Sequence, residues 1–190
     1  LAISIPQERD DGTLKRLLGP PMPQSAYFVG KVGMVAVIYV VQVALLMAIG
    51  VAFFGLAMPD SASKWVTFVW ISVLGLGSCT LLGVAFSSVP RTGRGAPALV
   101  SPIVLVLQFT SGVFFVFSEL PTWMQNFASI FPLKWLTQGM RSVFLPDSFA
   151  AQEVAGSWEL PQVAAAVVAW TVIGAVLALT TFRWQRRGER

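Results

Sequence analysis

The sequence contains no histidine and only one cysteine, Cys79. A single cysteine cannot form an internal disulfide, and without histidine the commonest metal ligand and general base are missing. Cys79 lies in a long apolar run, so we expect a small buried hydrophobic residue there. The chain also lacks the Gly-x-x-x-x-Gly-Lys-Ser/Thr motif that cradles nucleotide phosphates. We therefore predict no catalytic residue, no metal site and no nucleotide hydrolysis by this chain.

Charge is scarce as well. Charged residues make up 12% of the sequence and hydrophobic residues 55%, with a mean hydropathy of +0.71, whereas soluble domains carry about 25% charged residues. This composition predicts an all-α integral membrane protein whose surroundings are the lipid bilayer, and it does not indicate nucleic-acid binding.

Four segments are apolar enough to cross a bilayer, whose hydrocarbon core of about 30 Å needs about 20 helical residues. We place these spans at residues 26–56, 65–89, 96–117 and 161–182, within a single transmembrane domain that covers residues 1–190. The chain begins with Leu1 and has no signal-peptide pattern. We therefore expect it to be a fragment of a longer protein.

The most charged stretch lies before the first of these spans. Residues 5–18 are predicted to form one amphipathic cytosolic helix with Leu14, Leu17 and Leu18 on one face. Gly19 and the prolines that follow it end the helix, because proline cannot continue the hydrogen-bond ladder. A solvated charged loop that joins two spans is the alternative interpretation.

Residues 118–146 are too polar and too often interrupted by proline for an ordinary span. Prolines 121, 132 and 146 divide the segment into two short pieces, 122–131 and 133–145, that are rich in aromatic residues. Apolar pieces of about 10 to 14 residues are more often re-entrant or interfacial than spanning, and aromatic residues are enriched at the headgroup level. We predict a re-entrant or interfacial helical hairpin over residues 122–145.

Small and polar residues inside the spans have two interpretations each. Gly75 and Gly77 allow close approach between helices, and Gln42 suits a hydrogen bond between helices. Each could instead border a substrate path.

The placement of lysine and arginine predicts the orientation, because cytosolic loops carry an excess of both. One side of the predicted topology holds Arg9, Lys15, Arg16, Lys31, Arg91, Arg94, Arg183, Arg186, Arg187 and Arg190. The other side holds only Lys64, Lys134 and Arg141. We therefore expect both termini in the cytosol and the aromatic hairpin outside.

Three stretches in this order resemble the type-two ABC exporter permeases, a family of bacterial drug, lipid and polysaccharide export permeases. The stretches are Glu8 to Lys31 (ERDDGTLKRLLGPPMPQSAYFVGK), Ser111 to Phe115 (SGVFF) and Phe131 to Arg141 (FPLKWLTQGMR). The resemblance covers essentially the whole chain. It implies that the four spans are the third to sixth of a six-span permease in the plasma (inner) membrane.

The resemblance also implies roles for particular residues. The cytosolic helix would couple to a separate ABC ATPase subunit, which would hold ATP and Mg, through Glu8, Arg9, Asp10, Asp11, Lys15 and Arg16. The hairpin would form an outer gate with Phe114, Phe115, Trp123, Phe131 and Trp135. Gln42, Gly75 and Gly77 would border the path of a hydrophobic or amphipathic substrate, such as a drug, a lipid or a glycan-linked molecule, and a second permease copy or a homologue would complete that path.

Two other classes of protein are alternatives. A membrane-embedded enzyme would need ionisable residues that converge inside the spans, but each charged residue falls at an interface or in a loop. A non-transporting assembly or immunity component is the other alternative, and it would need no surface that matches an ATPase.

Overall fold

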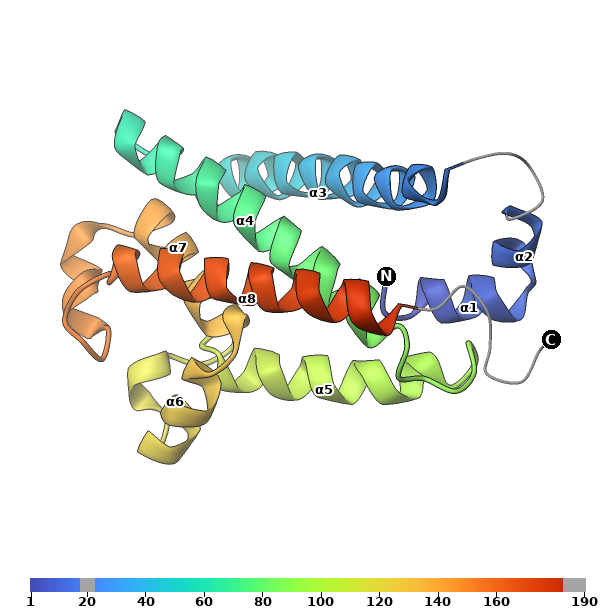
Figure 1. Ribbon diagram of the computed structural model, residues 1–190. Helices are drawn as coiled ribbons and strands as arrows, with labels where there is room; N and C mark the ends of the chain where they lie inside the picture. The colour runs from blue at the N-terminus through green and yellow to red at the C-terminus, as the bar shows by residue number, and fades with distance from the viewer. Residues whose placement is uncertain (18–22, 183–190) are drawn as a thin grey trace. The chain divides into compact units, whose positions relative to one another are not determined.

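The computed structural model describes residues 1–17 and 23–182, and every regular element in this part of the chain is a helix (Figure 1). The helices are α1 (Ser4–Asp10), α2 (Thr13–Leu17), α3 (Gln24–Phe54), α4 (Ala62–Phe86), α5 (Ala96–Thr110), α6 (Thr122–Ser129), α7 (Pro132–Phe144) and α8 (Leu160–Thr181), with 3-10 turns η1 (Phe117–Glu119) and η2 (Asp147–Gln152). The prediction of an all-helical protein is confirmed for these residues. Three of the helices, α3, α4 and α8, are long and apolar enough to cross a membrane.

Helix α5 is shorter than the predicted span 96–117. Its 15 residues extend about 22 Å at ~1.5 Å per residue, less than a hydrocarbon core of about 30 Å. The Thr110 hydroxyl donates back to the carbonyl of Val106 at 3.0 Å, and Gly112 has a left-handed backbone with φ +77°. A left-handed residue cannot continue a right-handed helix, so the helix ends at Thr110 and the count of four spans stays a prediction.

The other spans differ from the predicted ranges by a few residues at their ends. The first, predicted over 26–56, begins at Gln24 and ends at Phe54, before Gly55, whose φ of 63° is left-handed. The second, predicted over 65–89, begins at Ala62 because the Ser61 hydroxyl accepts the N–H of Lys64 at 3.4 Å, a capping arrangement. It ends at Phe86, where the hydroxyls of the next two serines bond to carbonyls of the last turn. The last, predicted over 161–182, is α8.

Two short helices replace the single cytosolic helix predicted over residues 5–18. Helix α1 ends at Asp10, and α2 begins at Thr13. Gly12 between them has φ +73°, a conformation that favours glycine and breaks the helix. Leu18 lies outside the described residues.

The predicted hairpin over 122–145 corresponds to α6 and α7. Pro132 occupies the first turn of α7, where its missing N–H leaves no carbonyl unpaired. The position of these two helices relative to a membrane stays a prediction.

The chain divides into two compact units, each of which is described by itself. Among the described residues, the handle unit comprises 1–17, 23–56, 79–101 and 174–182, and the hairpin unit comprises 57–78 and 102–173. A hydrophobic cluster forms the core of the handle unit, and its buried members are Ile5, Leu14, Tyr27, Val84, Ala85 and Ala178.

In the hairpin unit, Gly139 of α7 packs so closely that an added Cβ would lie 2.6 Å from Ile71 Cδ1 and 3.1 Å from Val163 Cγ1. Small residues allow this close helix packing.

Cys79 does not behave as expected. It is exposed on α4, although its neighbours Ser78 and Thr80 are buried. Successive helical residues point about 100° apart, so a buried neighbour on each side does not bury the residue between them. The expectation of a buried thiol was wrong.

Candidate coupling surface and aromatic hairpin

In the handle unit, Glu8 fastens α1 to α3. The hydroxyl of Tyr27 donates to Glu8 Oε2 at 2.9 Å, and the ammonium of Lys31 forms an ion pair with Glu8 Oε1. Tyr27 belongs to the buried cluster of this unit. Both carboxylate oxygens of Glu8 are therefore bound within the chain.

Asp10 fastens α1 to the loop between α4 and α5. The backbone N–H of Gly93 donates to Asp10 Oδ2 at 2.6 Å. A Cβ at position 93 would lie 2.6 Å from Gln7 Cα and 3.0 Å from the carbonyl oxygen of Pro6. The loop backbone therefore rests directly on the backbone of α1, an approach that glycine permits.

Three other predicted coupling residues face outward. Asp11, Lys15 and Arg16 are exposed, whereas Leu14 on the same short helix is fully buried in the core. Leu17 is partly buried against that core, so α2 packs on its own chain through its leucines. Arg9 is half-buried on α1.

The structure thus separates five of the six predicted residues into two groups, and the half-buried Arg9 belongs to neither. Glu8 and Asp10 make contacts within the unit, and Asp11, Lys15 and Arg16 form an exposed set that we call the charged edge. Sequence reasoning missed the partners Tyr27, Lys31 and Gly93 in this role. Tyr27 and Lys31 belong to a stretch that resembles the family. They lie 19 and 23 residues after Glu8, and no local sequence pattern indicates that they bind this carboxylate.

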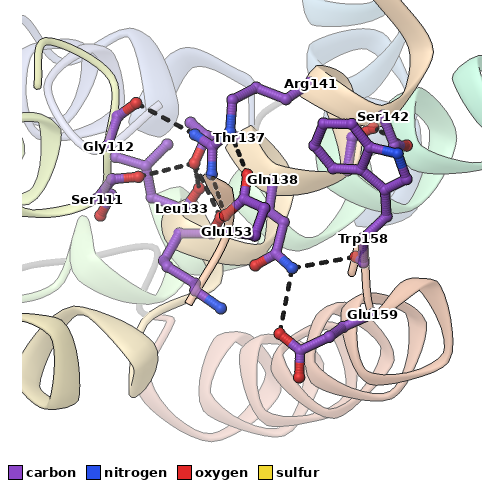
Figure 2. A network of polar contacts seen from close by, with 12 residues as sticks. Ser111, Gly112, Leu133, Thr137, Gln138, Arg141, Ser142, Glu153, Trp158 and Glu159 are labelled. Carbon is purple, nitrogen blue, oxygen red and sulfur yellow. Dashed lines mark hydrogen bonds and ion pairs between the residues drawn. The ribbon is translucent and has the colours of Figure 1, made fainter. Parts of the chain in front are cut away.

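In the hairpin unit, Arg141 of α7 joins three segments (Figure 2). Its Nε and Nη2 donate to the two carboxylate oxygens of Glu153 at 2.7 and 3.1 Å, and its Nη1 donates to the carbonyl of Gly112 at 3.2 Å. One turn earlier, the Thr137 hydroxyl donates to the carbonyl of Ser111 at 2.8 Å. Arg141 therefore ties α7 to the end of α5 and to the loop after η2.

Two more polar residues of α7 are buried. The amide of Gln138 donates to the carbonyl of Trp158 at 3.0 Å and to Glu159 Oε2 at 3.2 Å. The ammonium of Lys134 lies 3.5 Å from the ring centroid of Trp135 and 5.3 Å from that of Phe117. Burial lowers the pKa of Lys134, and the nearby carboxylates of Glu159 and Glu153 oppose that shift. From the sequence, Lys134 and Arg141 are predicted only to lie on the outer side of the membrane, and their contacts within the chain are not predicted.

The predicted gate aromatics fall into separate groups. Phe131 lies 5.1 Å from Phe127 and stacks on Trp170 at 6.3 Å between ring centroids, while the indole N–H of Trp135 donates to the carbonyl of Ser129 at 2.8 Å. Phe114 and Phe115 lie 4.9 and 5.8 Å from Phe109. Trp123 is largely exposed.

The three predicted path residues have different surroundings. Gln42 is exposed on α3. Gly75 is buried, and an added Cβ there would lie 2.8 Å from Leu136 Cδ2, so this glycine serves helix packing. An added Cβ at Gly77 would meet no atom within 4 Å. A substrate path along these residues stays a prediction.

Both units hold structural ion pairs and hydrogen bonds that join segments. Within residues 1–17 and 23–182, no group of three or more His, Cys, Asp or Glu side chains is placed to hold a metal ion. These contacts suit the mechanical connection of helices within each unit.

Comparison with known proteins agrees with the family resemblance of the sequence. A family model described as "ABC-2 family transporter protein" matches residues 1–182. The chain is 26% identical over 151 residues to the "Probable multidrug ABC transporter permease YbhR" of Escherichia coli strain K12, and equally to the protein of that name in strain O157:H7. The match covers 77% of this chain and 39% of each relative, so the chain spans about two fifths of their length. No solved structure matches the chain significantly.

Proposed function

Because this chain belongs to the ABC-2 family of transporter proteins, we propose that it is part of the membrane subunit of an ATP-driven exporter. Its cargo would be a hydrophobic or amphipathic molecule. The similarity to relatives named as probable multidrug permeases supports this class of cargo. ATP and Mg would bind to a separate ABC ATPase subunit, and a second permease copy or a homologue would complete the pathway.

The observation that carries the proposal is the division of the cytosolic segment into a charged edge and an inner side. The charged edge, Asp11, Lys15 and Arg16, would dock on the ATPase. The inner side is bonded to α3 through Glu8 and to the α4–α5 loop through Asp10. A movement of the ATPase would then pass along two bonded connections to the spans, in the manner of rigid elements that transmit a domain closure.

The proposed topology places this chain in the inner membrane with both ends in the cytosol. Helices α3, α4 and α8 would each cross the bilayer. Helix α5 is too short to cross alone, so the fourth crossing would be completed by the segment after Gly112. The α6–α7 hairpin would lie at the outer surface as a re-entrant gate with Trp123, Phe131 and Trp135. Phe114 and Phe115, in the segment between α5 and η1, would complete the outer gate.

Asp10→Ala in the full-length permease tests the inner connection. A hydrogen bond to a charged group contributes about 1.5–3 kcal/mol, so we expect ATP-driven transport to fall roughly tenfold while the ATPase subunit remains bound. The measurement is uptake of a neutral fluorescent dye into inside-out vesicles that contain the permease and its ATPase, with ATP hydrolysis recorded in parallel. Asp147→Ala, at an exposed aspartate of the hairpin unit, is the matched control. Transport at the wild-type rate in Asp10→Ala would remove this connection from the mechanism.

A further inference from the structure

The hairpin unit contains a cavity of about 310 Å³. Its lining includes Phe114 and Phe115 of the irregular segment after α5, and also Arg141, Phe149, Glu153 and Trp158. Cavities that bind small ligands measure about 300–1,000 Å³. This cavity therefore fits one apolar group of a drug-sized molecule.

The aromatic wall is not part of the core of the unit. Phe114 and Phe115 are 58% and 54% exposed, and Phe149 is 40% exposed. Phe114 and Phe115 belong to the segment between α5 and η1, outside the helices that are apolar and long enough to span. Aromatic rings that line a cavity and remain open offer a flat apolar surface to a ligand.

The polar side of the cavity offers hydrogen-bond donors without a net charge. Arg141 uses Nε and one N–H on Nη2 for Glu153 and one N–H on Nη1 for Gly112, so of the five guanidinium N–H groups one on each Nη remains. Glu153 neutralises the guanidinium as a bidentate pair (Figure 2).

We propose that this cavity binds an uncharged amphipathic molecule that presents an aromatic group to the phenylalanines and a carbonyl-type oxygen to these donors. An anion would meet the carboxylate of Glu153, and a cation would find that carboxylate already paired. The identification of the ligand as cargo on its outward route rests on the proposed function. Binding itself requires neither the ATPase nor transport.

The test is photolabelling of the purified full-length permease with two matched probes. 4-Methylbenzophenone is neutral and aromatic with a carbonyl oxygen, and 4-benzoylbenzoate is its anionic counterpart. Labelled peptides are quantified by mass spectrometry at increasing probe concentration. We expect the neutral probe to label residues 112–118 and 145–153 saturably, and the anionic probe to label them about tenfold less.

Glu153→Gln provides the decisive variant. It keeps an oxygen that accepts from Arg141 but removes the negative charge, so the guanidinium becomes a site for an anion. We expect the preference for the neutral probe to disappear, with labelling by 4-benzoylbenzoate increasing about tenfold to the level of 4-methylbenzophenone. Phe149→Ala, at an exposed ring that bears no hydrogen bond of its own, should weaken labelling by both probes. Phe53→Ala, at an exposed ring of α3 in the handle unit, is the matched control and should change neither.

Three results would overturn the proposal: labelling that does not saturate and spreads over α3 and α8, an unchanged probe preference in a folded Glu153→Gln variant, or unchanged labelling in Phe149→Ala. If Glu153→Gln fails to fold, the Phe149→Ala result decides. A full-length permease that is labelled saturably but shows no ATP-driven transport would contradict the proposed function and leave the binding site in place. A permease that transports normally but is not labelled saturably would contradict the binding site and leave the proposed function in place.

Discussion

Arg141→Met is expected to destabilise the protein by about 3 kcal/mol, because removing one partner of a buried ion pair leaves the other charge uncompensated. The side chain of Glu153 is 8% exposed, and Arg141 supplies both hydrogen bonds to its carboxylate. The carbonyl of Gly112 loses its bond to Nη1 as well. In a chain of this size such a loss corresponds to a decrease in melting temperature of about 6–12 °C, measured by thermal unfolding of the detergent-purified protein.

Two further variants separate the pair from the loss of a large side chain. Arg141→Met combined with Glu153→Leu should recover most of the stability, because replacement of both partners by apolar residues is often neutral. Lys64→Met removes the partner of Asp60, whose side chain is 76% exposed, and should cost less than about 1 kcal/mol. An Arg141→Met variant that melts like the wild type would show that Glu153 does not depend on this pair.

Gly93→Ala is expected to have an effect of similar size in the handle unit. The new Cβ would lie 2.6 Å from Gln7 Cα and 2.9 Å from its backbone nitrogen, and backbone atoms cannot rotate away as a side chain can. Overpacking typically costs about 1–3 kcal/mol, and the displaced loop would also lose the bond from Gly93 to Asp10. We expect a loss of about 3 kcal/mol in thermal unfolding, together with faster hydrogen exchange in α1.

Gly30→Ala is the control for this substitution. Gly30 lies in α3 of the same unit, and an added Cβ there meets no atom within 4 Å. Alanine is favoured over glycine in a helix by about 1 kcal/mol, so this variant should be at least as stable as the wild type. If Gly93→Ala and Gly30→Ala behave alike, the close approach of the loop to α1 is not a feature of the protein in solution.

The long apolar runs made the positions of α3, α4 and α8 predictable within a few residues, because a helix that crosses lipid must satisfy its own backbone and carry apolar side chains. The end of α5 was not predictable in the same way. Residues 111–117 remain apolar enough to continue a span, and the helix stops because one residue, Gly112, adopts a left-handed conformation. Gly12 divides the cytosolic helix for the same reason.

The sequence predicted which charged residues make up the candidate site, but it did not predict which of them are bonded within the chain. A run of charged residues reads as one exposed surface, and nothing local distinguishes Glu8, bonded to α3, from the exposed Asp11. That distinction depends on Tyr27, Lys31 and Gly93, which become neighbours of α1 only in the folded chain. Arg141 and Glu153 are likewise joined across the 3-10 turn η2, whose conformation cannot be predicted from a hydrophobic period.

If the charged edge on α2 and the turn before it binds an ABC ATPase subunit, as we propose, reversal of its charges should release that subunit. The most direct measurement is affinity purification of the full-length permease in mild detergent, comparing the wild type with the triple reversal Asp11→Lys, Lys15→Glu and Arg16→Glu. Asp147→Lys, a reversal at an exposed aspartate of the hairpin unit, is the matched control. We predict that the wild type and the control retain the ATPase subunit and that the triple reversal retains about a tenth or less of it. Equal recovery with all three proteins, or no ATPase with any of them, would contradict the claim.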